Sequence, residues 1–445
     1  MLTYLLPVSW DSIQLASKQA THIYTTGSWL LPDIIDSGHP PGFGIYVSGW
    51  WTVFGRNLLV THLSMIPINL LFFYQLIRVS ERMGGSYWPY LFTLLMFEPL
   101  VLGQLCMISP DLAICGLLFM LLLAVMDKNH WLKLLAVLLL SVISTRAWML
   151  VMGVFVIDLF ANGKLDFWRK LWPYALGSLP AQVYLLTHYL AKGWIGYHEN
   201  SPWIESLAIV EPSEMLFNVG LLGWRMIDYG RIYLWIAAGI LLYRNRHSLR
   251  PFWQKYGFFI LAFVVFVLSI CVAVIPRHGI VGPRYLMPAI LVFDLLFAAL
   301  VFEYELLKKP FALKLRKSIW LGACLFLLSG SFWLYPFRIA QSWDATPLHV
   351  IHHENERKVI DWLDEKGIPL EQVGTVYPSI GPLDFRYVDG RHDGFVKYDG
   401  ENPYLFVSMV HNAWRDEELD YIEEAYEEVA GWSRLGVFGR IYRKR

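Results

Sequence analysis

Charged residues are scarce in this chain. Asp, Glu, Lys and Arg make up 17% of its 445 residues, whereas a soluble domain contains about 25%. Hydrophobic residues reach 56%, above the ~45–50% of ordinary globular domains. This balance excludes a disordered chain, a basic nucleic-acid-binding protein and an ordinary soluble enzyme. It predicts a polytopic membrane protein.

Cysteine is scarce too, and all four residues lie in apolar stretches: Cys106, Cys115, Cys271 and Cys324. None follows Ala340, which excludes a disulfide framework there, and no pair has the spacing of a metal-binding thiol motif. The part after Ala340 also has neither a Gly-rich phosphate loop nor a recognisable catalytic triad. We interpret the cysteines as small core residues.

The formal net charge of zero is a cancellation between two parts of the chain. Up to Ile339 there are 25 basic and 17 acidic residues, an excess of +8; from Ala340 onward there are 12 basic and 20 acidic residues, an excess of −8. We therefore predict a transmembrane domain over residues 1–339 and a polar soluble domain over residues 340–445.

The fold class predicted for the first part is a mainly α, polytopic transmembrane bundle of ten helices, each needing about 20 mostly apolar residues. Three stretches lack Asp, Glu, Lys and Arg throughout: Asn57–Ile77, Tyr256–Pro276 and Ser318–Phe337. Seven are less regular: Tyr87–Cys106, Asp111–Met126, Trp131–Thr145, Trp148–Phe160, Leu171–Ala191, Leu222–Tyr243 and Arg284–Phe302.

The loop charges predict the orientation in the inner or plasma membrane. The loops that include Arg244, Arg246 and Arg250 form the set richer in Lys and Arg, and such loops are cytoplasmic. Residues 1–56 and the C-terminal domain are then outside the cell. Because an external start needs a span to export it, we also expect a first transmembrane helix to be missing from this chain.

Residues 340–445 are predicted to form a small external α/β domain, large enough for its own core. The expected elements are helices over His352–Lys366 and Asp416–Ala430 and strands over Val373–Tyr377, Tyr404–Val407 and Val437–Tyr442. We favour a structural or acceptor-recognising role for this domain over a second active site.

Three predicted external segments gather polar residues that suit one chemistry. They are the first segment with Trp10-Asp11-Ser12 and Gly38-His39-Pro40-Pro41, then Ser109-Pro110-Asp111, then Gly282-Pro283-Arg284-Tyr285-Leu286-Met287-Pro288. A carboxylate can deprotonate an acceptor hydroxyl while cationic groups stabilise a leaving phosphate.

The order of these motifs, with Phe54-Gly55 ending an aromatic helix, resembles the GT-C membrane glycosyltransferases. The branch in question contains the protein O-mannosyltransferases and the lipid A aminoarabinose transferase, and the resemblance covers most of the chain. It implies a bundle of transmembrane helices with juxtamembrane helices in the first external loop. It also implies transfer of a sugar from a polyprenyl monophosphate carrier to a lipid, glycan or protein acceptor on the outer side, with membrane lipids and no nucleic acid as partners.

The resemblance implies roles for several residues. Asp11 would be the catalytic base, and Asp111 would be the acidic residue of the second external loop. The groups near the carrier phosphate would be His39 and Arg284 with Tyr285, and the position of Arg146 at the outer surface makes it a further candidate.

The sequence also departs from the family pattern. Ser12 stands where a second acidic residue is frequent, and Gly38-His39 replaces a Glu-Lys pair, which removes a carboxylate that could hold a metal. The need for a divalent metal is therefore open, with His39, His198 and Glu199 as weak ligand candidates.

Each candidate residue has a structural alternative. Asp11 could be a helix N-cap, Asp111 could complement a helix dipole, and Arg284 could anchor its helix at the interface. Two further acids, Asp33 and Asp36, are interpreted as solvated loop residues.

Arg225, Asp228 and Arg231 are spaced by three and should share one helix face. We interpret them as an internal ion-pair row, with a donor-phosphate site at Arg225 as the alternative.

Two other functions compete with the glycosyltransferase. A transporter or flippase of a lipid-linked substrate would need internal repeats or paired broken helices at the midplane, and we recognise none in the sequence. A non-catalytic envelope scaffold derived from a glycosyltransferase is the third possibility, and the altered residues Ser12 and Gly38 keep it open.

Overall fold

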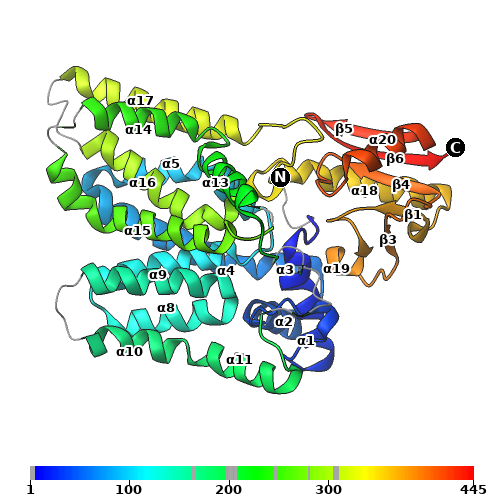
Figure 1. Ribbon diagram of the computed structural model, residues 1–445, viewed down its shortest axis with the longest axis horizontal. Helices are drawn as coiled ribbons and strands as arrows, with labels where there is room; N and C mark the ends of the chain where they lie inside the picture. Colours follow the sequence, from blue (N-terminus) through cyan, green and yellow to red (C-terminus); the bar gives the residue numbers. More distant parts are fainter. Residues whose placement is uncertain are drawn as a thin grey trace.

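The computed structural model describes residues 6–161, 167–196, 198, 204, 208–244, 246, 249–278, 281–303 and 310–445. Long helices form a bundle on one side of the molecule, and a six-stranded sheet with its helices lies beyond one end of that bundle (Figure 1). This agrees with the predicted mainly helical fold with a small α/β part. The domain boundary at residue 339 stays a prediction.

The bundle helices run back and forth along its length (Figure 1). In chain order they are α4 (Met65–Gly84), α5 (Trp88–Met96), α6 (Pro99–Leu105), α7 (Asp111–Met126), α8 (His130–Ile143), α9 (Thr145–Ala161), α10 (Phe167–Gly177), α11 (Leu179–Lys192), α13 (Pro212–Ile227), α14 (Ile232–Arg244), α15 (Arg250–Val274), α16 (Met287–Glu303) and α17 (Pro310–Gly330). Three helical stretches are long and apolar enough to cross a membrane: Leu58–Met96, Arg250–Val274 and Pro283–Phe302. They overlap predicted spans, and the total of ten spans stays a prediction.

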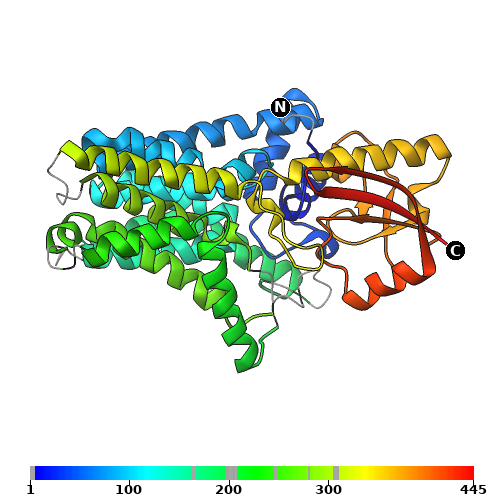
Figure 2. The ribbon, with the colours of Figure 1, turned by 90° about the horizontal axis from the view of Figure 1, so that it is seen from above.

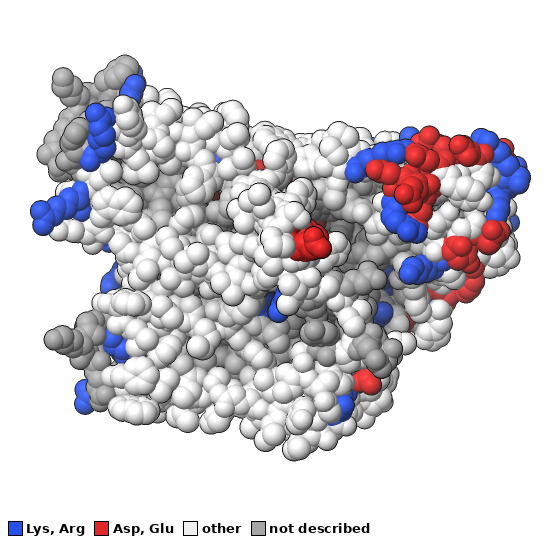
Figure 3. Space-filling view, in the orientation of Figure 1, with Lys and Arg blue, Asp and Glu red and all other residues white. Residues whose placement is uncertain are grey.

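Helices α7 and α16 form the centre of the bundle. Both are apolar on all sides, which is the pattern of a helix enclosed by other helices. The apolar stretch that contains α16 is 94% buried, whereas that of α15 is 22% buried and exposes Val264, Leu268 and Val272. Figure 3 shows a broad belt almost free of charge over this face of the bundle, with Lys and Arg at the end away from the sheet. Such a belt suits lipid surroundings.

One predicted span is interrupted by a proline. Tyr87–Cys106 divides into α5 and α6 because Pro99 disfavours helical backbone at the residue before it, and Glu98 is extended with ψ 118°. A second predicted span, Ser318–Phe337, loses its last residues, since α17 ends at Gly330.

The predicted span Leu222–Tyr243 is also interrupted. Tyr229 and Gly230 have φ values of 52° and 86°, which end α13 before α14 begins. Arg225 therefore lies on α13 and Arg231 in the turn before α14, and the predicted single row of charges on one helix is wrong. Arg231 Nε instead donates to Glu98 Oε1 at 3.1 Å, with both side chains fully buried, so the two helix breaks meet in an ion pair enclosed by the bundle.

The N-terminal segment forms short helices between the bundle and the sheet (Figures 1 and 2). They are the π-helix η2 (Ile13–Lys18), α1 (Gln19–Thr26), the 3-10 helix η3 (Asp33–Ile35), α2 (Gly42–Phe54) and α3 (Leu58–Leu63). Trp51 at the centre of this layer is completely buried, and its indole donates to Thr61 Oγ1 at 2.8 Å. That this layer lies along the membrane as an external first loop stays a prediction.

The C-terminal part has a mixed sheet in the order β2-β3-β1-β4-β6-β5. Its elements are α18 (His349–Lys366), β1 (Val373–Thr375), β2 (Gly381–Pro382), α19 (Asp384–Tyr387), β3 (Gly394–Lys397), β4 (Tyr404–Ser408), α20 (Asp416–Ala425), β5 (Tyr426–Arg434) and β6 (Val437–Lys444). Strand β1 is parallel to β3 and β4, and β6 is antiparallel to β4 and β5. Helix α18 packs on this sheet through Val359, Ile360 and Leu363.

The predicted helix Asp416–Ala430 is too long. Helix α20 stops at Ala425, and Tyr426 begins β5, where it pairs with Lys444. The connection from β5 to β6 runs through Leu435 and Gly436, whose φ values of 47° and 81° are those of a tight hairpin turn. Strand β6 thus agrees with the predicted strand Val437–Tyr442, whereas β5 was not indicated by the acidic sequence.

Candidate active site

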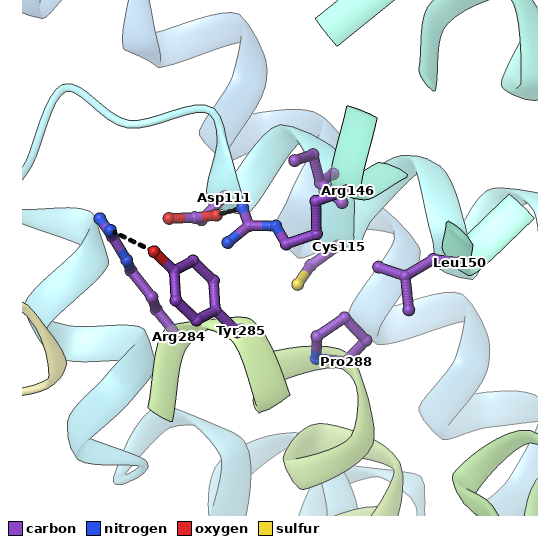
Figure 4. A pocket seen from close by; sticks show the side chains of 8 residues that line it. Asp111, Cys115, Arg146, Leu150, Arg284, Tyr285 and Pro288 are labelled. Carbon is purple, nitrogen blue, oxygen red and sulfur yellow. Dashed lines mark hydrogen bonds and ion pairs between the residues drawn. The ribbon is translucent and has the colours of Figure 1, made fainter. Parts of the chain in front are cut away.

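Five segments that are distant in the sequence meet at the end of the bundle near the sheet. They are the segment at Asp11 just before η2, the starts of α7 and α9, and the 3-10 helices η6 (Pro283–Leu286) and η8 (Trp343–Ala345). In Figure 4, Arg284 and Tyr285 face Asp111 and Arg146. A narrow pocket lies here, lined by Asp111, Ile114, Cys115, Arg146, Leu150, Arg284, Tyr285 and Pro288.

Asp11 is held in place by two side chains from other parts of the chain. Its Oδ2 accepts a hydrogen bond from Arg284 Nη2, and its Oδ1 accepts one from the Tyr377 hydroxyl at 3.0 Å. The Asp11 side chain is 20% exposed, so it is both fixed and reachable. These contacts are those of an ion-pair partner, and they place the candidate base beside the pocket.

Arg284 is bound by two carboxylates at once. Besides its contact with Asp11, its Nε pairs with Asp344 Oδ2 at 3.0 Å, and its Nη2 donates to the Tyr285 hydroxyl at 3.0 Å. Burial raises the pKa of the Asp344 carboxyl, an effect that the Arg284 guanidinium opposes. Asp344 follows the last bundle helix, and no sequence motif singled it out.

A second ion pair lies across the pocket. Arg146 Nη2 donates to Asp111 Oδ1, and Ser109 Oγ donates to Asp111 Oδ2 at 3.0 Å. The guanidinium groups of Arg146 and Arg284 each lie 4.9 Å from the centroid of the Tyr285 ring, a cation–π geometry. The structure thus brings the candidate acids and the candidate phosphate ligands together.

His39 lies next to the second ion pair. Its Nδ1 is 2.6 Å from the hydroxyl of Thr145, the residue before Arg146. Burial and the charge of Arg146 lower the pKa of His39 to about 4, so its imidazole is neutral near pH 7. Any contact of His39 with a phosphate would then be a hydrogen bond from a neutral ring.

Gly38 explains one departure from the family pattern. It has a φ of +68°, and a Cβ at this position would lie 1.7 Å from the carbonyl oxygen of Gly196. Because no side chain fits there, the Glu of the family pattern could not be accommodated in this loop.

Asp36 is not a solvated loop acid, contrary to the prediction, because it is completely buried. Its Oδ2 accepts from Lys192 Nζ at 2.5 Å and from His188 Nε2 at 2.9 Å, and its Oδ1 accepts from the backbone N–H of Gly38 at 2.9 Å. Asp36 therefore fastens the loop that carries His39 to α11. Asp33 has a side chain that is 57% exposed, as expected, and pairs with Lys192 at 2.8 Å.

The other candidate residues lie away from the pocket. Arg225 Nη1 pairs with Asp228 Oδ2 at 3.3 Å, and Arg225 Nε donates to the carbonyl of Val281 at 3.1 Å, which is the geometry of the internal ion pair. His198 Nε2 is 3.1 Å from the carbonyl oxygen of Asp33, and Glu199 lies outside the described residues. Within the described ranges neither His39 nor His198 belongs to a cluster of metal-ligating side chains.

The helical bundle and the small α/β part beyond one end of it agree with the fold that the resemblance to the GT-C glycosyltransferases implies. The chain is similar to two solved structures of ArnT from Cupriavidus metallidurans, one bound to undecaprenyl phosphate and one in the apo state. Both structures have a TM-score of 0.55 and 11% sequence identity to this chain. Each alignment covers 99% of this chain; it covers 95% of the chain bound to undecaprenyl phosphate and 96% of the apo chain. No protein-family profile and no curated protein matches the sequence. The likeness confirms the predicted fold.

Proposed function

We propose that this protein is a multi-pass membrane glycosyltransferase that transfers a sugar from a polyprenyl monophosphate carrier to an acceptor hydroxyl. The loop charges support an orientation with the active site and the C-terminal part on the extracytoplasmic side of the inner or plasma membrane. The observation that carries the proposal is the Asp11–Arg284 contact, which joins a reachable carboxylate to a cation that lines the pocket.

The residues at the pocket suit a single displacement with inversion. The Asp11 carboxylate takes the proton of the acceptor hydroxyl, whose oxygen forms a bond to the anomeric carbon of the sugar. The bond from that carbon to the phosphate oxygen breaks, and its electron pair leaves with the polyprenyl phosphate. Arg284 and Arg146, which both border the pocket, stabilise the negative charge of that phosphate.

Both arginines are paired with carboxylates before any substrate arrives. The carrier phosphate must therefore displace Asp11 from Arg284 and Asp111 from Arg146. This exchange leaves Asp11 free of its cation while the sugar is bound, which makes it a better base. Donor binding and activation of the base are then one event.

The transporter alternative gains no support from the two helix breaks. Broken helices of transporters present their ends to a substrate cavity at the midplane. Here the breaks are joined by the fully buried pair Arg231–Glu98, which holds α6 and α14 together.

Binding of the carrier tests the proposed site directly. We expect Arg284→Gln to weaken binding of undecaprenyl phosphate to the purified full-length protein in detergent by at least about tenfold, because a charge-assisted contact of a phosphate contributes about 1.5–3 kcal/mol. Titration with the phospholipid, followed by tryptophan fluorescence, measures the change. The control is Arg277→Gln, because Arg277 is exposed. This variant should bind undecaprenyl phosphate as the unmodified protein does. Equal binding by Arg284→Gln would contradict the assignment.

Tyr377 supports the candidate base from the C-terminal part. The partial burial of its ring and the nearby Asp11 carboxylate raise the pKa of Tyr377 well above its usual value, so its hydroxyl donates to Asp11. We expect Tyr377→Phe to lower kcat about tenfold with little effect on the KM of the donor, since a hydrogen bond to a charged group is worth about 1.5–3 kcal/mol. Steady-state transfer assays measure both constants.

Tyr421→Phe is the matched control for this change. Tyr421 is 40% exposed, close to the 38% of Tyr377, and lies on α20 away from Asp11. A loss of activity in both variants would assign the effect to the C-terminal part as a whole rather than to the Tyr377 hydroxyl.

A further inference from the structure

The first turns of α18 carry a group of buried metal-ligating side chains. His352, His353 and Glu356 each offer one ligand atom, and these atoms lie within 4.8 Å of one another. The exposed fractions of the three residues are 0%, 4% and 0%. The group lies in the C-terminal part, and none of its members was among the metal candidates expected from the sequence.

The hydrogen bonds of His352 leave one ring nitrogen with a free lone pair. Its Nδ1 is 2.9 Å from Ser408 Oγ, and that hydroxyl donates its proton to the carbonyl of Phe438 at 3.0 Å. His352 Nδ1 must therefore be the donor, so the proton is assigned to Nδ1. Nε2 then carries the lone pair, and it has no hydrogen-bond partner in the described structure.

The hydrogen bonds of His353 follow the same logic with the two nitrogens exchanged. Its Nε2 is 2.8 Å from Ser9 Oγ, whose proton goes to the carbonyl of Pro7 at 2.9 Å. The lone pair is thus on Nδ1, which is completely buried and also has no partner within the described residues. Buried polar atoms are rarely left unpaired, and two imidazole lone pairs in one cluster call for a ligand.

Glu356 is fixed as the third ligand of such a site would be. Its Oε1 accepts from Ser379 Oγ at 2.7 Å, and both its oxygens accept from the Arg386 guanidinium. His411 Nδ1 accepts from the backbone N–H of Ser408 at 3.1 Å, so its Nε2 donates to Ser379 Oγ at 3.1 Å. Oxygen partners that orient each ligand in this way are a regular feature of metal sites.

The hydrogen bonds of the two rings also fit a metal. Each ring has its proton on the nitrogen that faces a serine hydroxyl and its lone pair on the other nitrogen. An imidazole with one free lone pair is the form that coordinates a metal. The Arg386 guanidinium contacts both oxygens of Glu356, so a metal ion would share this carboxylate with Arg386.

We propose that His352 Nε2, His353 Nδ1 and the Glu356 carboxylate bind one divalent transition-metal ion of the Zn²⁺ class. Two imidazole nitrogens and a carboxylate oxygen form a ligand set that Zn²⁺ accepts, with a fourth position left for water.

The site has a structural consequence for the candidate active site. Ser9, which holds His353, is two residues before Asp11, and Trp10 packs edge-on against the rings of His352 and His353 at 6.4 and 5.7 Å between centroids. A metal on α18 thereby fixes the segment that carries Asp11 and acts as a positioning element. The metal binding itself does not depend on the proposed reaction.

Metal content and metal uptake test this proposal. The full-length protein, purified in detergent without chelator, is analysed by elemental mass spectrometry, then stripped and titrated with Zn²⁺ or Co²⁺. We expect about one Zn²⁺ per chain, and for Co²⁺ the visible d–d bands of a four-coordinate site. His352→Asn and His353→Asn should each lower the metal content at least about tenfold.

His349→Asn is the matched control. His349 is on the same helix and only 1% exposed, but its Nδ1 is bonded to the carbonyl of Thr346 at 2.7 Å, so this variant should keep the metal. The proposal is overturned if the stripped protein takes up neither ion, or if the two variants bind metal as the unmodified protein does. Should the variants fail to fold, the Co²⁺ spectrum and a Zn²⁺-dependent rise in the Tm of the unmodified protein decide the question alone, and absence of both overturns it.

Discussion

Asp11→Asn is expected to reduce sugar transfer by about 10²–10⁴-fold, the usual contribution of a general base. The Asn side chain has the same shape, and its Oδ1 can accept from Arg284 while its Nδ2 donates to the Tyr377 hydroxyl oxygen, so the fold should persist. It cannot take up the acceptor proton. The measurement is the rate of transfer from a polyprenyl-phosphate sugar by the purified protein in proteoliposomes.

The same variant should bind undecaprenyl phosphate at least as well as the unmodified protein. Asn carries no charge and competes less strongly than Asp11 for Arg284, so the carrier phosphate finds the guanidinium more available. Slow transfer together with retained binding separates a missing base from a damaged site.

Asp33→Asn is the control for this experiment. Asp33 belongs to the same N-terminal segment, but its side chain is 57% exposed and pairs with Lys192 instead of Arg284. We expect the transfer rate of Asp33→Asn to stay within about twofold of that of the unmodified protein, because an exposed ion pair contributes less than about 1 kcal/mol. Near-normal turnover by the Asp11→Asn variant would contradict the assignment of Asp11 as the base. It would favour the alternative of a non-catalytic scaffold.

The largest effect on stability is expected for Arg386→Met. The Arg386 and Glu356 side chains are 1% and 0% exposed and form a two-point ion pair. Removing only the cation leaves a buried, uncompensated carboxylate, which costs about 3–5 kcal/mol. A lower Tm of the full-length protein in detergent, recorded in the presence of a chelator, measures the loss.

Arg391→Met provides the comparison. Arg391 also pairs with acidic residues, Asp364 and Asp393, but its side chain is 35% exposed. Pairs of this kind contribute about 0–1 kcal/mol, so the Tm should hardly move. Equal shifts in the two variants would show that the burial of the Arg386–Glu356 pair does not govern stability.

Local patterns in the sequence predicted most of the helices and several residues of the site. Helix α7 begins and ends as expected, because a continuous apolar run between Pro110 and Asp127 leaves few alternatives. The breaks in other helices are set by single residues: Pro99 acts on Glu98 through local sterics, whereas the positive φ of Tyr229 is a tertiary effect. Prediction from hydropathy alone treats the two stretches Tyr87–Cys106 and Leu222–Tyr243 as uninterrupted spans.

Parts of the site could not be predicted because they depend on contacts between distant residues. Tyr377 reaches Asp11 across 366 positions, and neither residue's neighbourhood in the sequence indicates the other. The histidines of α18 were assigned to an amphipathic helix, since their free lone pairs become visible only when Ser9 and Ser408 are in place. Asp36 was misjudged for the same reason, because its partners come from α11.

The two Arg–Asp pairs at the pocket also bear on how the proposed reaction ends. Asp11, Asp111 and Asp344 supply three carboxylates against the two guanidinium groups of Arg284 and Arg146. The spent carrier phosphate therefore leaves a site whose own acids can reclaim both cations at once. Each acid works as an intramolecular competitor that lowers the apparent affinity for the product, as any self-occupied state does. Rapid release of the carrier, rather than tight capture of the donor, is the kinetic property that this arrangement favours.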